Sequence, residues 1–352
     1  MDKGRGEIAQ MGGMTTELNR AAGLSALAAG GVWDLVIIGG GATGLGTALD
    51  AAARGYRTLL LEGHDFAKGT SSRATKLVHG GVRYLAQGNL HLVRHALHER
   101  GRLLANAPQV TRRQGFVVPC YRWWDMAFYG AGLFAYDLLA GKLGLGRSRL
   151  LSRSDVMRRL PTVKTDGLVG GIHYYDGQFD DSRLAITIAA SAADHGATLL
   201  NYVRVTGLLK TDGRITGVTA RDTETGTDYS IQAKAVVNAA GIFMDEIRHM
   251  DRPDLAEGLS LSQGIHLVLD PGFLASDDAI LIPKTADGRV LFVLPWLGRT
   301  VIGTTDTPID SASLEPHAQE SEIAFLLDHA AHYLTRAPSR SAVLSVFTGI
   351  RP

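Results

Sequence analysis

The chain has 352 residues, 45% of them hydrophobic and 20% charged, and its formal net charge is +1. This length predicts about two domains with sizeable cores, and the near-neutral charge balance indicates no nucleic-acid partner. Cys120 is the only cysteine, so the chain can form neither an internal disulfide nor a thiolate metal cluster, and no metal site is predicted.

The first 32 residues combine scattered charges with small residues and contain no sustained apolar run. A secretory signal peptide needs such a run, so this segment does not have the pattern of one. We expect residues 1–32 to form a mobile leader, with at most a short Ala-rich helix.

Residues 33–63 have the pattern of a βαβ unit. An apolar run at residues 35–38 suits a strand buried on both faces of a parallel sheet, and it ends at three adjacent glycines. An Ala-rich helix follows to about Arg54, Gly55 ends it, and "RTLLLE" predicts a second buried strand. These elements predict the start of a doubly wound α/β domain.

The glycines between this strand and helix have the spacing of a dinucleotide-binding loop. Gly39 permits the sharp turn, Gly41 lets the backbone approach a diphosphate, and Gly44 allows close packing of helix on strand. Glu62 ends the next strand, where an acid can accept hydrogen bonds from ribose hydroxyls. FAD and NAD share this arrangement, so the loop alone leaves the choice between them open.

The rest of the chain alternates between helical and strand-like patterns. Apolar residues recur at helical spacing over residues 89–106, and Pro108 is expected to end that helix. Residues 178–196 begin with an Asp pair and end with a glycine, which are the capping signals of another helix. Residues 197–240 then predict a β-meander closed by a fully apolar strand at residues 235–237.

The stretch "TSSRATKLVHGGVRYL", residues 70–85, is rich in hydroxyl and basic side chains. It belongs to a longer basic region that runs to Arg122 and in which Glu99 is the only acidic residue. Three readings compete: a solvated helix face, an anionic membrane surface and an anionic ligand. The adjacent glycines and the hydroxyls favour a ligand at residues 70–85, whereas the later arginines are typical of a solvated face.

Several motifs, taken in order, resemble those of one family. They are the glycine loop with the stretch that follows it, then "VVNAAG", "LFVLPW", "VIGTTD" and the terminal "GIRP". Over about residues 33–352 the chain resembles the FAD-dependent glycerol-3-phosphate dehydrogenases of the aerobic type. The resemblance implies an α/β fold, in which a Rossmann-like, doubly wound FAD-binding domain carries an inserted mixed-sheet substrate or cap domain.

The resemblance also implies how these domains divide the chain. The FAD-binding domain is expected to be discontinuous, with segments at residues 33–88, 166–250 and 345–352. The substrate or cap domain is expected at residues 89–165 and 251–344.

The resemblance assigns one group of residues to the cofactor: Thr70, Ser71, Ser72, His79, Gly80 and Gly81, in addition to Gly39, Gly41, Gly44 and Glu62. It assigns a second group to the substrate: Arg83, Tyr84, His266 and Arg351. Arg351 is expected to bind the substrate phosphate, because a guanidinium group donates hydrogen bonds in a planar fork. His266 is the preferred base for the hydroxyl proton, and His79 is the other candidate.

The reaction implied is oxidation of sn-glycerol 3-phosphate to dihydroxyacetone phosphate, with hydride transfer to N5 of FAD and electrons passed on to a quinone. Two alternatives stay open. The chain could be another FAD-dependent hydroxy-acid or amine oxidase, or a noncatalytic remnant of a truncated flavoprotein.

Two departures from the family pattern bear on this expectation. Gln263 stands where the family usually has a lysine, which is expected to remove a positive charge from the substrate pocket. The chain also ends at "GIRP", where family members continue into a further Gly-rich stretch and a helical domain. We therefore expect a C-terminally truncated chain that binds FAD weakly.

Residues 123–141 are the most apolar stretch of the chain. Asp125 and Asp137 interrupt it, so it is not expected to span a membrane. Trp123 and Trp124, with nearby arginines, suit either a membrane interface or a buried cap helix. We expect a cytoplasmic protein with peripheral contact at the inner face of the cell membrane.

Overall fold

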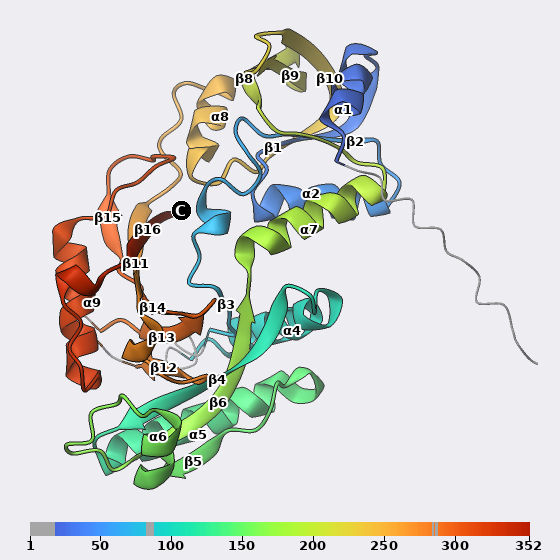
Figure 1. Ribbon diagram of the computed structural model, residues 1–352. Helices are drawn as coiled ribbons and strands as arrows, with labels where there is room; N and C mark the ends of the chain where they lie inside the picture. The colour runs from blue at the N-terminus through green and yellow to red at the C-terminus, as the bar shows by residue number, and fades with distance from the viewer. Residues whose placement is uncertain (1–17, 82–87, 284, 286–287) are drawn as a thin grey trace, which may run out of the picture. The chain divides into compact units, whose positions relative to one another are not determined.

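The computed structural model describes residues 18–81, 88–283, 285 and 288–352 (Figure 1). Contacts divide the chain into two compact units. Unit 1 comprises Met1–Ala67 and Ala185–Leu255, and unit 2 comprises Lys68–Leu184 and Ala256–Pro352. Each unit has its own sheet.

Unit 1 contains a six-stranded sheet in the order β7-β2-β1-β10-β9-β8. Its strands are β1 (Val32–Ile38), β2 (Thr58–Leu61), β7 (Thr198–Leu200), β8 (Val203–Thr211), β9 (Arg214–Asp222) and β10 (Asp228–Asn238). Strands β7, β2, β1 and β10 run parallel, and β10, β9 and β8 form an antiparallel meander. The predicted meander is confirmed, and its closing strand β10 pairs with β1.

Helices cover both faces of this sheet, which explains why β1 and β2 are almost continuously apolar. On one face, α2 (Ala42–Ala53) and the alanines of α7 (Asp181–Asp194) pack against Ile37 and Leu60. On the other face, Leu27 of α1 (Arg20–Ala28) packs in a cluster with Val36 and Leu59. The unit is completed by η3 (Gly241–Phe243) and α8 (Met244–Asp251).

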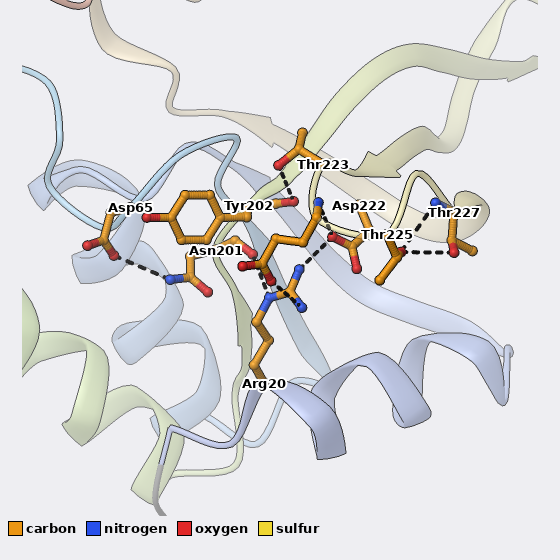
Figure 2. Close-up of polar contacts among 9 residues, drawn as sticks. Arg20, Asp65, Asn201, Tyr202, Asp222, Thr223, Thr225 and Thr227 are labelled. Carbon is orange, nitrogen blue, oxygen red and sulfur yellow. Dashed lines mark hydrogen bonds and ion pairs between the residues drawn. The ribbon is translucent and has the colours of Figure 1, made fainter.

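Helix α1 lies within the segment that was expected to be a leader with a short Ala-rich helix, and of that segment the structure describes residues 18–32. Its Arg20 donates from Nη2 to Oδ1 of the fully buried Asp222 at 2.6 Å and from Nε to Asn201 O at 3.2 Å (Figure 2). Arg20 Nη1 also pairs with Glu224 at 2.8 Å. Because these contacts and Leu27 attach α1 to the sheet, the helix is part of unit 1.

Unit 2 contains a ten-stranded mixed sheet in the order β15-β11-β14-β13-β12-β4-β6-β3, with β16 paired to β11 and β5 paired to β6. Its strands are β3 (Leu77–Val78), β4 (Thr111–Cys120), β5 (Arg149–Ser152), β6 (Gly170–Phe179), β11 (Leu261–Leu269), β12 (Ala279–Ile282), β13 (Leu291–Trp296), β14 (Arg299–Gly303), β15 (Thr307–Ile309) and β16 (Ser345–Arg351). The pairs are antiparallel except for β12 with β4.

The helices of unit 2 are α4 (Leu90–Asn106), α5 (Trp123–Ala140), α6 (Arg153–Arg159) and α9 (Glu320–Tyr333), with short turns η1 (Thr70–Ser72), η2 (Gly141–Leu143), η4 (Pro271–Phe273) and η5 (Arg340–Ala342). The predicted helix over residues 89–106 is α4, which ends just before Pro108. It lies beside α5 (Figure 1), and Val93 and Leu97 pack against Tyr136 there.

The boundaries of the two units differ from the domain division expected from the sequence. Residues 68–81, 88, 166–184 and 345–352 were expected in the FAD-binding domain, and their contacts assign them to unit 2. The reason is strand pairing, because β3 pairs with β6 and β16 pairs with β11. Which segments serve the cofactor stays a prediction.

Candidate functional site

The glycine loop of unit 1 leaves no room for side chains at two of its predicted positions. Gly39 has φ +110°, and a Cβ atom there would lie 2.5 Å from Ala239 O. A Cβ atom on Gly44 would lie 1.9 Å from Gly39 O. The first glycine therefore allows the turn and the third allows α2 to approach β1, as the sequence predicted.

Gly40 is a third constrained position, which the spacing rule missed. Its N–H donates to Glu62 Oε2 at 2.6 Å, and a Cβ atom on Gly40 would lie 2.8 Å from Glu62 Cβ. Glu62 Oε1 accepts from His64 N at 2.8 Å. The triplet of adjacent glycines was the available signal. Because each carboxylate oxygen can accept a second hydrogen bond, Glu62 can still receive ribose hydroxyls.

The loop opens helix α2 at Gly41, which makes no side-chain capping hydrogen bond. A helix N-terminus carries a partial positive charge and directs backbone N–H groups outward, which favours a diphosphate. A tight glycine turn, an uncapped helix start and an acid at the next strand end are the parts that a dinucleotide requires. The residues present therefore fit such a cofactor.

In unit 2, the segment after the loop is tied to the end of β16. Thr70 Oγ1 donates to Ile350 O at 2.6 Å. Arg73 donates to Leu314 O and to Glu315 Oε2, both at 2.8 Å, and Lys68 also pairs with Glu315. Arg73 in the stretch and Lys68 just before it thus stabilise the fold. The cofactor roles of Thr70, Ser71 and Ser72 stay predictions.

Lys76 forms the most buried ion pair of this stretch. Its Nζ donates to the two carboxylate oxygens of Asp181 at 2.7 and 2.8 Å and to Ser72 O at 2.9 Å. Asp181 Oδ2 also accepts from Ala74 N at 3.0 Å. The ammonium lies 5.1 Å from the centre of the Phe347 ring. Lys76 was not among the predicted site residues.

His266, the predicted base, is buried on β11. Its Nε2 lies 2.9 Å from Thr75 Oγ1, and its ring stacks on Phe347 with centres 4.6 Å apart. Burial lowers the pKa of His266 to about 3, and the charges of Lys76 and Arg351 contribute to that shift. The imidazole is therefore neutral at physiological pH, which is the form that can accept a proton.

Arg351, the predicted phosphate ligand, is held at the end of β16. Its Nη2 donates to Thr305 O, and its Nη1 lies 3.3 Å from Asp306 Oδ1. The side chain is 41% exposed, so part of the guanidinium can be reached from solvent. We use the name His266 cluster for Thr75, Lys76, Asp181, His266, Phe347 and Arg351.

A buried carboxylate supports Arg351 through Thr305. Glu322 Oε1 accepts from Thr305 Oγ1 at 2.9 Å, and its Oε2 accepts from Gln263 Nε2 at 2.8 Å. Thr305 Oγ1 also accepts from Ile265 N at 3.0 Å. Gln263 is thus a buried hydrogen-bond partner of Glu322. The positive charge of the family's usual lysine, which Gln263 lacks, would therefore lie beside a carboxylate. The distance between Gln263 and Glu322 in sequence hid this contact.

The other predicted residues have different surroundings. Arg83 and Tyr84 lie outside the described residues. His79 is exposed, and its Nδ1 accepts from Gly81 N at 3.1 Å. A Cβ atom on Gly80 would lie 2.4 Å from Leu97 Cδ2, so helix packing requires that glycine. Cofactor contacts of residues 79–81 stay predictions.

Comparison with known proteins agrees with this geometry. The profile of the family described as FAD dependent oxidoreductase matches residues 34–352. The chain belongs to this family. The expected family resemblance, the α/β fold class and FAD as the family's cofactor are thereby confirmed.

The chain is similar to individual proteins that share one name, glycerol-3-phosphate dehydrogenase. The chain is 44% identical over 336 residues to the mitochondrial glycerol-3-phosphate dehydrogenase of Homo sapiens, covering 91% of this chain and 46% of that protein. It is 46% identical over 333 residues to that of Arabidopsis thaliana, covering 91% of this chain and 53% of that protein. The chain thus spans about half the length of these curated relatives.

Solved structures that are similar to the chain have the same fold. The glycerol-3-phosphate dehydrogenase of Bacillus halodurans, solved in complex with FAD, is 33% identical with a TM-score of 0.78 and covers 94% of this chain and 59% of its own. L-proline dehydrogenase from P. horikoshii is 16% identical with a TM-score of 0.72, covering 91% of this chain and 82% of its own. The second comparison shows the fold alone.

Proposed function

We propose that the chain binds FAD and oxidises sn-glycerol 3-phosphate to dihydroxyacetone phosphate. The observation that carries this proposal is the neutral imidazole of His266 close to two cations, Lys76 and Arg351. A proton acceptor beside positive charge suits a substrate that has both a hydroxyl to oxidise and a phosphate. The names of the relatives with 44% and 46% identity support the same substrate.

The residues of unit 1 would hold the cofactor by its diphosphate and ribose. Gly39, Gly40 and Gly44 keep the loop free of side chains, and Glu62 offers acceptors to the ribose hydroxyls. When bound, FAD supplies the hydride acceptor at N5. The part of the chain that we can assign to chemistry is the binding of substrate and the removal of its proton.

The His266 cluster would perform these two tasks. Arg351 would donate hydrogen bonds to the phosphate, and His266 would accept the proton of the secondary hydroxyl. A pKa of about 3 makes His266 a weak base before substrate binds. The negative charge of the phosphate would offset Lys76 and Arg351, which raises the pKa of His266 when it is needed.

The test is anaerobic flavin reduction. The purified chain is supplied with FAD, and its visible spectrum is recorded before and after glycerol 3-phosphate, a 2-hydroxy acid or an amino acid. We expect bleaching with glycerol 3-phosphate and with neither of the other two substrates. Arg351→Met should raise the concentration of glycerol 3-phosphate that gives half-maximal bleaching. Bleaching only with another substrate would favour the hydroxy-acid or amine oxidase alternative. Bound FAD that no substrate reduces would favour the noncatalytic remnant.

We also propose that a quinone receives the electrons and that α5 contacts a membrane surface. In the described residues, no helix has the length and apolar character to cross a bilayer. However, α5 has an exposed face of Trp123, Trp124, Phe128, Phe134 and Leu138, of which Trp124 and Leu138 are 83% exposed. This exposure contradicts a fully buried cap helix and supports interfacial contact at the cytoplasmic face of a membrane.

Liposome sedimentation tests the membrane proposal. We expect the chain to pellet with anionic vesicles, and Trp124→Ser with Phe128→Ser to abolish pelleting. Leu344→Ser is the matched control, because Leu344 is 59% exposed and lies outside α5. Equal pelleting of the variant and the control would reject α5 as the contact. A short-chain quinone is then compared with oxygen as electron acceptor in the reduced protein.

A further inference from the structure

We infer that Thr75 is a positioning residue for His266, and that the ion pair of Lys76 with Asp181 holds Thr75 in place. The hydroxyl of Thr75 determines which imidazole nitrogen carries the proton, so that Nδ1 is the atom that accepts the substrate proton. The catalytic meaning rests on the proposed function, whereas the contact itself is a feature of unit 2. Thr75 was not among the predicted site residues.

Two close neighbours, Phe347 and Gly303, confine the imidazole ring. Phe347 on β16 stacks on the ring with an interplanar angle of 7°. Gly303 on β14 lies so near that a Cβ atom there would be 2.1 Å from His266 Cδ2. The ring therefore has little room to rotate. Among the described residues, Thr75 Oγ1, at 2.9 Å from Nε2, is the polar contact left to orient it.

The two neutral forms of His266 differ in what they leave unpaired. Nδ1 is buried and has no hydrogen-bond partner among the described residues. If Nδ1 carried the proton, a buried N–H donor would have no acceptor, which folded proteins rarely tolerate. If Nε2 carries it, that N–H donates to Thr75 Oγ1, and the Nδ1 lone pair is ready to accept. The second form is favoured.

In the proposed reaction, this form places the proton acceptor at one atom. The O–H bond of the substrate's secondary hydroxyl breaks and an N–H bond forms at Nδ1 of His266. The hydride on the carbon that bears this hydroxyl would be transferred to FAD. The alcohol thereby loses two electrons and becomes a ketone. The resulting imidazolium keeps its hydrogen bond to Thr75 through Nε2.

Asp181 contacts both sequence neighbours of Thr75, through the backbone of Ala74 and the side chain of Lys76. Its Oδ2 accepts from the N–H of Ala74 at 3.0 Å, and its carboxylate pairs with Nζ of Lys76. Lys76 has φ +63°, a left-handed conformation that is unfavourable for a side chain with a Cβ atom. The buried ion pair offsets that cost. A residue held between two such contacts can keep its hydroxyl directed at Nε2.

The test reads the proton position directly by NMR of the chain labelled with 15N-histidine. The His266 signals are assigned by their loss in His266→Gln. We expect wild type and Thr75→Ser to have a protonated Nε2 and an unprotonated Nδ1. Thr75→Val, which keeps the volume and removes the hydroxyl, should shift His266 towards a mixture of both forms. Unchanged His266 signals in Thr75→Val would overturn the inference. If Thr75→Val does not fold, Thr75→Ala replaces it.

Flavin reduction supplies a second readout. Relative to wild type, Thr75→Val should slow reduction by glycerol 3-phosphate on the order of tenfold, with an unchanged half-saturation, and Thr75→Ser should restore most of the rate. Equal rates in wild type and Thr75→Val would also reject the positioning role. If glycerol 3-phosphate reduces none of these proteins, the proposed function fails, whereas the NMR result still decides whether Thr75 sets the proton position.

Discussion

The glycine loop of unit 1 and the His266 cluster of unit 2 are built in different ways. The loop is a contiguous piece of backbone. One carboxylate from elsewhere contacts it, that of Glu62, which is 22 residues from Gly40 and accepts its N–H. The cluster is made of side chains from β11, β16, the start of α7 and the turn after η1. Backbone sites depend on spacing along the chain, whereas side-chain sites depend on which strands pair.

The two regions should therefore fail in different ways. The loop has no spare volume, so it is sensitive to added atoms. The cluster contains buried charges and one unpaired nitrogen, so it is sensitive to removed partners.

The largest effect is expected from Gly44→Val in the loop. Its Cβ atom would overlap Gly39 O, and neither backbone can move without displacing α2 from β1. We expect a loss of about 3 kcal/mol or more in the free energy of unfolding, measured by urea titration, together with loss of FAD binding. Gly46→Ala is the control, because nothing lies within 4 Å of its Cβ position. A stable Gly44→Val protein would show that the loop tolerates added atoms.

Asp181→Asn tests the cluster by removing one charge. It leaves the largely buried ammonium of Lys76 without its carboxylate, which should cost about 2–3 kcal/mol in the free energy of unfolding. Asp50→Asn in α2 breaks an ion pair with Arg54 in which both side chains are 66% exposed, so its effect on the free energy of unfolding should be far smaller than that of Asp181→Asn. Similar losses in both variants would contradict the importance of burial.

His266 predicts a pH dependence. The pKa of its folded form is about 3, below the ordinary value of 6.5, so the unfolded chain takes up a proton first as pH falls. His266 should therefore reduce stability by about 2 kcal/mol between pH 7 and pH 5, and the loss should continue towards pH 3. His266→Asn should remove this part of the pH dependence in urea titrations. An identical dependence in both proteins would mean that His266 is not buried in its neutral form.

The smallest effect is expected from Gln263→Lys. The new ammonium would lie beside the buried Glu322, where its attraction and its desolvation nearly balance. We expect a change of about 1 kcal/mol or less in the free energy of unfolding. A much larger loss would indicate that the site has no room for the longer side chain.

Some of the site could be predicted from residue types alone. The order of β1, the loop, α2 and β2 follows from apolar periodicity and glycine spacing, and Glu62 follows from its place at a strand end. His266 and Arg351 were named from a family resemblance, because no local pattern marks them. Gly40, Lys76 and Thr75 were missed as site residues, and each has a partner far away in sequence.

What the sequence determined by itself is the βαβ unit with its turn, because steric limits on backbone and the period of apolar residues act between near neighbours. The tertiary structure decided that α1 packs on the sheet, that Gln263 meets Glu322, and that Thr75 faces His266. The residues of each of the last two contacts are at least 59 positions apart in sequence. Such contacts exist only after strands have paired, because pairing selects which distant side chains share a buried space.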